Sequence, residues 1–156
     1  MEAPFEWLLE GAPYIRYRTR RDLLGLPEDD PQVAADRAAM LADPLVEGLV
    51  NELRDWPGPI IASHKSAKQH FHRLAFLADL GLRADDPGMG EVLERVTSLR
   101  SVEGPFALHM NIGAAYGGSG KDELAWALCD TPLIEYALLK MGLRGEPGVE
   151  AAGAHL

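Results

Sequence analysis

The sequence predicts an all-α fold made of repeated αα-hairpins, and three observations lead to that prediction. A short sequence motif occurs three times, around Gly25, Gly81 and Gly142, at a spacing of roughly 60 residues. It consists of a glycine between two apolar residues, then a polar loop, then an acidic residue and a proline. Apolar residues recur at helical spacing after each copy, as Val33 and Met40 do after the first. No segment shows the alternation of apolar and polar residues that a half-buried strand requires.

Each copy of this motif is predicted to be the turn between two helices. The preceding helix ends at the glycine, which adopts the left-handed conformation without a Cβ clash. A short polar loop follows, and an acidic residue then precedes a proline, the pattern of an N-cap and the first helical position. The acid–proline pairs are Asp30-Pro31, Asp86-Pro87 and Glu146-Pro147. These carboxylates are therefore interpreted as caps rather than as a catalytic acidic motif.

The remaining predicted helices follow from further proline signals. Pro13 opens a helix over 14–24, and Pro44 opens one that ends near Trp56, where two prolines follow closely. The segment 102–120 is predicted to be an irregular loop, and a loop this long in a helical domain is typical of functional segments. The other predicted helices begin at Pro31 and at Pro87, or cover 68–80, 122–128, 131–141 and 147–156.

Composition excludes several classes of protein. The 156 residues fit one helical-repeat domain spanning 1–156, and the net charge of −9 excludes general nucleic-acid affinity, which needs a positive surface. No apolar run has the length of a membrane span, and the N-terminal residues lack the basic region of a secretory signal. A single cysteine, Cys129, excludes an internal disulfide framework and predicts a cytoplasmic location.

The third copy of the motif is followed by only a short predicted helix, from Pro147 to the last residue, Leu156. Arrays of helical repeats need neighbouring or capping units to bury their faces. We therefore expect the chain to be the N-terminal part of a longer protein, or to associate with itself through this C-terminal helix. A naturally short chain is the alternative.

The Leu-Gly-Leu-x-x-Asp-Asp-Pro hairpins, together with the segments 7–25, 72–81 and 126–132, resemble bacterial squalene-cyclase-like or prenyltransferase-repeat proteins. The resemblance covers nearly the whole chain and implies a partial α/α toroid of concentric inner and outer helices, at the N-terminal half of such a protein. The Asp-x-Asp-Asp and Gln-x-x-x-Gly-x-Trp motifs of the cyclases are absent. Of the zinc ligands of the prenyltransferases, only Cys129, Asp130 and a choice of histidines are available. The resemblance thus predicts an architecture, no cofactor, and no defined reaction.

The strongest candidate site is the cationic segment 64–72. His64 and Lys68, and likewise Lys68 and His72, are four residues apart, so they would share one face as a helix begins. A helix start adds its positive dipole end, which suits a phosphate, diphosphate or carboxylate, and Lys65 adds a further charge. No metal site is predicted, because His70 and His72 point apart on a helix. The alternative is that these residues make structural polar contacts.

Two further motifs carry weaker signals. Cys129 is interpreted as a small buried residue before a helix capped by Asp130 or Thr131; a nucleophilic role would need His72 or His109 nearby as a base. The segment 115–122 is similar to a phosphate-binding loop but lacks the Ser or Thr after its lysine, so a flexible loop is preferred.

These observations give two hypotheses for function. The first is a binding module, or the relic of an enzyme, that holds an apolar or isoprenoid-like ligand in the concave face of the inner helices. Aromatic side chains would form the wall, although ordinary core packing is the alternative for them. They are Trp7, Tyr14, Tyr17, Phe71, Phe76, Trp126 and Tyr136. The polar ligand-binding candidates are His64, Lys65, Lys68, His72, His109 and Asp130. The second hypothesis is a helical-repeat scaffold for protein interaction, without catalysis. A cavity lined by aromatics would favour the first, and an exposed apolar edge the second.

Overall fold

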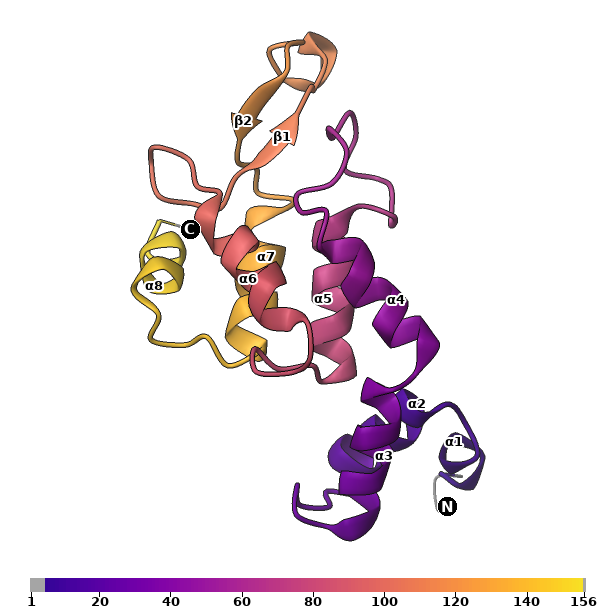
Figure 1. The fold of residues 1–156 in the computed structure, drawn as a ribbon. Helices are drawn as coiled ribbons and strands as arrows, with labels where there is room; N and C mark the ends of the chain where they lie inside the picture. Colours follow the sequence, from indigo (N-terminus) through magenta and orange to yellow (C-terminus); the bar gives the residue numbers. More distant parts are fainter. Residues whose placement is uncertain (1–4, 156) are drawn as a thin grey trace. The chain divides into compact units, whose positions relative to one another are not determined.

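The computed structural model describes residues 5–155, and this part of the chain is mostly helical with one small sheet (Figure 1). The predicted helical class is therefore right for most of the chain, while the toroid arrangement stays a prediction. None of the helices in the described range combines the length and the apolarity that crossing a membrane demands.

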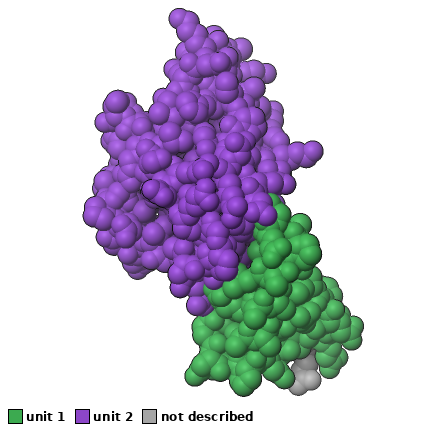
Figure 2. Space-filling view, viewed as in Figure 1, with its two compact units in different colours: residues 1–48 green, residues 49–156 purple. Residues whose placement is uncertain are grey.

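The chain divides into two compact units, residues 1–48 and 49–156 (Figure 2). Helix α4 (Pro44–Leu53) includes residues of both units. Asp43 precedes it, and Oδ1 of Asp43 accepts a hydrogen bond of 2.9 Å from the amide of Leu45, as the acid–proline pattern predicts.

The first unit contains α1 (Glu6–Leu9), α2 (Pro13–Arg18), the π-helical turn η1 (Thr19–Leu23) and α3 (Pro31–Leu41). The predicted helix over 14–24 is confirmed, with its last turn widened to a π-helix. Helices α2 and α3 pack together and bury Tyr17, Val33 and Met40. Asp36 joins them, because its carboxylate accepts bonds of 2.7 Å from Nε of both Arg16 and Arg20.

The second unit is built on α5 (His70–Leu80), which packs against α7 (Thr131–Lys140). The other helices are α6 (Met89–Ser98) and α8 (Pro147–Gly153), and α8 packs on α7. The apolar positions of these helices recur at helical spacing and meet in one core. Its fully buried side chains include Phe71, Leu74, Leu77, Met89, Ile134 and Leu138.

The glycines of the repeated motif have the left-handed backbone conformation that was predicted for them. Gly25, Gly81 and Gly142 have φ values of 65°, 101° and 99°, in the region that side chains disfavour. After the second, the amide of Leu82 donates to the carbonyl of Leu77 over 3.1 Å, which satisfies a carbonyl at the helix end.

The acid–proline caps are confirmed in part. Oδ1 of Asp30 accepts bonds from the amides of Gln32 (2.8 Å) and Val33 (3.2 Å), so Asp30 caps α3. Glu146 occupies the N-cap position of α8, but its carboxylate makes no capping bond. The prediction for Asp86 is wrong. Its Oδ2 accepts from the amide of Arg83 over 2.7 Å and closes the turn, so α6 begins later, after Gly88.

The predicted helix over 122–128 is also wrong. Strand β2 (Glu123–Ala125) lies there and pairs antiparallel with β1 (Leu108–Met110) inside the segment that was predicted to be irregular. Met110 lies opposite Glu123, and the short 3-10 helix η2 (Ala114–Tyr116) lies in the connection. Three-residue strands are too short for alternation to be recognised in a sequence.

Candidate functional site

A cleft of ≈ 560 Å³ lies in the second unit, where the β1–β2 hairpin meets the loop before α5. Figure 1 shows this loop and the hairpin at the same end of α5 and α7. The residues that line the cleft are mostly apolar, with a few polar side chains, which is typical of small-molecule sites. The larger apolar ones are Met110, Ile112, Tyr116 and Trp126, and the polar ones are Ser63, His64, Lys65, Glu123 and Cys129.

The loop that carries His64 and Lys65 spans 57–69 and is attached to β1 by backbone hydrogen bonds. The amide of Ile61 donates to the carbonyl of His109, and the amide of Asn111 donates to the carbonyl of Ile61, both over 2.9 Å. The side chain of Ile61 is 3% exposed, so it also fixes the loop by packing. At the other end of the loop, the side-chain amide of Gln69 donates to the carbonyl of Ser63. The polar edge of the cleft is therefore held in place on both sides of His64.

His64 is oriented by a buried carboxylate. Its Nε2 lies 2.9 Å from Oδ2 of Asp130, a residue with no exposed surface. Oδ1 of Asp130 accepts from the amide of Ala127 and lies within hydrogen-bond distance of the Thr131 hydroxyl, both at 3.1 Å. Because a carboxylate only accepts, Nε2 carries a proton, and a neutral His64 ring has Nδ1 as its acceptor. An oriented imidazole in a cleft can accept a proton or hydrogen-bond a polar ligand.

Trp126 is also fixed by polar contacts. Its indole N–H donates to Oε2 of Glu103 over 2.6 Å, and its ring meets His155 edge-on at 5.3 Å between centroids. A ring that is already immobilised loses little conformational freedom when a ligand packs against it. Of the other aromatic residues expected to form a cavity wall, Tyr17 and Phe71 are buried in the cores of their units.

The structure brings together four of the seven predicted ligand-binding residues: His64, Lys65 and Trp126 line the cleft, and Asp130 lies behind His64.

The other three predicted residues do not line the cleft. Lys68 is exposed in the loop, and Nε2 of His72 lies 3.4 Å from the carbonyl oxygen of His64. His109 is exposed while Leu108 and Met110 are buried, as alternation along β1 requires. The expected cationic helix face does not form, because α5 begins only at His70.

Sequence reasoning missed the part of the cleft formed by the hairpin. Met110, Ile112 and Tyr116 come from the segment 102–120, and the only signal for them was the length of that predicted loop. The prediction that Cys129 is buried is wrong: the thiol is free and exposed at the cleft, since the chain turns Asp130 inward instead.

Across residues 5–155, no group of three or more His, Cys, Asp or Glu side chains is arranged to hold a metal ion. Comparisons of the chain with known protein families, with curated proteins and with solved structures found no match. The likeness to squalene-cyclase-like proteins therefore stays a prediction, and the function has to be argued from the cleft.

Proposed function

We propose that the protein binds a small amphipathic molecule in this cleft, with an apolar, isoprenoid-like body and an anionic head. One observation carries the proposal: a cationic side chain, Lys65, and an oriented imidazole, His64, share one cleft with the apolar wall of Met110, Ile112 and Trp126. The volume falls within the range of roughly 300–1,000 Å³ that is usual for small-molecule sites.

The head group is inferred from the charges of the cleft. Lys65 has no carboxylate partner at ion-pair distance among the described residues, whereas the acidic side chain of the cleft, Glu123, accepts a bond of 2.7 Å from the Ser119 hydroxyl. An anion beside Lys65 gains a charge-assisted hydrogen bond that no group of the protein already occupies. The net charge of −9 gives no long-range attraction for anions, so the local lysine has to select the head group.

A titration with matched ligands tests the proposal. Geranyl diphosphate, geraniol and inorganic diphosphate are each titrated into the protein by isothermal calorimetry. We expect geranyl diphosphate to bind most tightly, because only this ligand contacts both the apolar wall and Lys65. Lys65→Ala should weaken it about 10- to 100-fold, the loss of a charge-assisted hydrogen bond, and should leave geraniol unchanged.

Lys68→Ala is the control for this titration, since Lys68 is a neighbouring exposed lysine that does not line the cleft. Equal losses in the two variants would show that only the general charge matters. Failure of all three ligands to bind would refute the proposal.

The second candidate function, a scaffold for protein interaction, is supported by a different surface. Phe76 of α5 is 43% exposed, and Tyr136 and Leu139 of α7 are 42% and 36% exposed. A scaffold would lose its partner when Phe76 and Leu139 are replaced with serine, while the ligand titration would be unaffected. Self-association through the C-terminal helix stays a prediction, which sedimentation of the protein at increasing concentration tests.

A further inference from the structure

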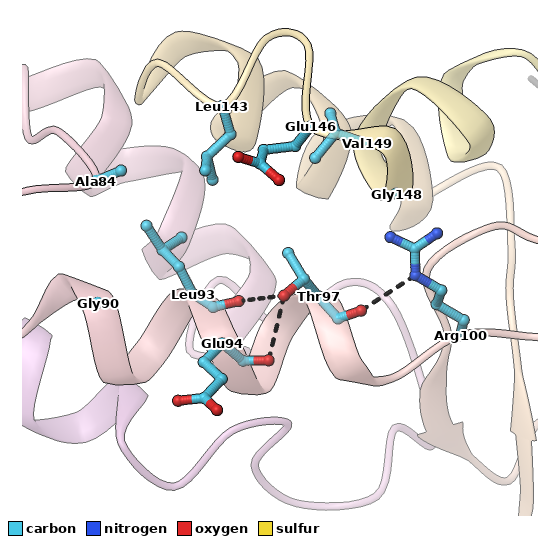
Figure 3. Close-up of a pocket in the computed structure, with 10 residues that line it drawn as sticks. All are labelled: Ala84, Gly90, Leu93, Glu94, Thr97, Arg100, Leu143, Glu146, Gly148 and Val149. Carbon is cyan, nitrogen blue, oxygen red and sulfur yellow. Dashed lines mark hydrogen bonds between the residues drawn. The ribbon is translucent and has the colours of Figure 1, made fainter.

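A second cavity, of ≈ 420 Å³, lies between α6 and the connection from α7 to α8 (Figure 3). It shares no lining residue with the cleft described above. Leu93 and Thr97 of α6 face it from one side, and Leu143 and Glu146 face it from the other. Arg100 lies at one end of the cavity, beside Gly148.

The guanidinium of Arg100 is held in place by three contacts. Its Nε donates to the carbonyl of Thr97 over 3.1 Å, and its Cζ lies 5.0 Å from the ring centroid of Phe106, a fully buried residue. It also lies directly against Gly148, since a Cβ added there would come within 1.8 Å of Nη2. The side chain is therefore ordered before any ligand arrives, which reduces the entropy lost on binding.

The two terminal nitrogens of Arg100 have no hydrogen-bond acceptor among the described residues. The guanidinium attracts the carboxylate of Glu135, but within the described part of the chain neither Nη1 nor Nη2 makes a hydrogen bond. A guanidinium presents these N–H groups as a planar fork that matches the two oxygens of a carboxylate. An ordered fork without an acceptor, at one end of a cavity, is the arrangement of a carboxylate site.

The surrounding acids exclude a simple anion as the ligand. The carboxylate of Glu146 points into the space between the connection and α6, and Glu94 also lines the cavity. The carboxylates of Glu146 and of Glu135, which is attracted by Arg100, repel a dianion, and Glu146 attracts a cationic group to the part of the cavity away from Arg100. A zwitterion satisfies both ends at once. The apolar walls formed by Leu93, Leu143 and Val149 suit an aliphatic side chain between them.

We infer that this cavity binds a small aliphatic zwitterion of the α-amino-acid type. Its carboxylate pairs with Arg100, its ammonium group pairs with Glu146, and its side chain packs on Leu93 and Leu143. This is a separate site from the cleft, with a different class of ligand, and it does not depend on the proposed amphipathic ligand.

The chemistry is tested with leucine and two derivatives, each titrated into ¹⁵N-labelled protein and followed by amide chemical shifts. Leucinamide lacks the carboxylate, and N-acetylleucine lacks the ammonium group. We expect leucine to shift amides of α6 and of 143–149, and each derivative to bind at least tenfold more weakly, a difference of about 1.4 kcal/mol. Equal binding of leucinamide would overturn the role of Arg100, and equal binding of N-acetylleucine that of Glu146. The absence of shifts at about 10 mM leucine would overturn the site altogether.

The variant Gly148→Ala moves the guanidinium of Arg100 without removing it. Gly148 lies in α8 with an ordinary helical backbone, so alanine fits the helix, but its Cβ displaces Nη2 of Arg100. We expect leucine to bind at least tenfold more weakly, while the amide spectrum shows that the protein stays folded. Gly113→Ala is the matched control, because a Cβ there meets nothing within 4 Å. Equal leucine affinity in the two variants would contradict the assignment.

Discussion

Replacing Gly58 with alanine tests the contact that anchors the start of the 57–69 loop, which carries His64. Gly58 has a φ of 79°, and a Cβ there would lie 2.4 Å from Nδ1 and 2.6 Å from Cε1 of His70. The His70 ring has little room to move, because it is buried and its Nε2 bonds the carbonyl of Glu52 over 3.0 Å. Burial lowers the pKa of His70, so the ring is neutral at pH 7 and Nε2 is the donor in that bond.

The expected loss of stability has two parts. The left-handed backbone costs a residue with a Cβ about 1–2 kcal/mol. Moving the ring breaks its bond to Glu52 and leaves buried polar groups unpaired, at about 1–3 kcal/mol. We therefore expect Gly58→Ala to lower the free energy of unfolding by about 2–5 kcal/mol, measured by urea denaturation with far-UV circular dichroism. Gly142→Ala, in the same unit, is the control, since Gly142 has a φ of 99° but nothing within 4 Å of an added Cβ.

A double-mutant cycle separates the two parts. In a His70→Ala background the ring is gone, so Gly58→Ala should cost only the backbone part, and the coupling between the two substitutions should be about 1–3 kcal/mol. Equal losses for Gly58→Ala and Gly142→Ala, or a coupling below about 0.5 kcal/mol, would refute the steric argument.

Two further predictions concern the first unit and the pH dependence of the second. Asp30→Ala should lower the stability of the first unit by about 1 kcal/mol, the usual value of an N-cap, and Asp30→Ser should restore most of it in urea denaturation; equal losses in both would contradict the cap. Burial, with repulsion from Glu150, raises the pKa of Glu135 despite attraction by Arg100. The folded state then holds this proton more tightly than the unfolded state, so the carboxyl lowers stability as the pH rises from about 4 through its raised pKa. Glu135→Gln should remove that decline. Parallel stability–pH curves for the unmodified protein and the variant would contradict the effect of Glu135 on stability.

The parts of the fold that sequence could predict depend on short-range interactions. The helix ends at Gly25, Gly81 and Gly142 were predictable because glycine adopts the left-handed conformation at a helix end without the Cβ clash that other residues meet. Asp86 shows the limit of this reasoning. An aspartate before a proline can cap a helix or close the preceding turn, and which occurs depends on where Arg83 lies.

The candidate site was predictable only in its composition. His64 and Lys65 stood out by charge and Trp126 by its aromatic ring, but the pairing of His64 with Asp130 joins residues 66 positions apart. No local pattern marks such a contact, because it exists only after the loop attaches to β1 and α7 packs on α5. The same holds for the second cavity, where Arg100 approaches Gly148, a residue far from it in the sequence.

The small sheet offers only a short edge for pairing with strands of other molecules. One side of β1 pairs with β2, and its other side bonds Ile61 through the carbonyl of His109 and the amide of Asn111, so β2 forms the open edge of the sheet. That edge is three residues long, shorter than the six or seven residues of typical amyloid-forming segments. Lys121 and Asp122 precede it and Glu123 begins it, and charges of this kind oppose in-register stacking of identical strands. The hairpin thus supplies one wall of the cleft without creating a template for strand addition.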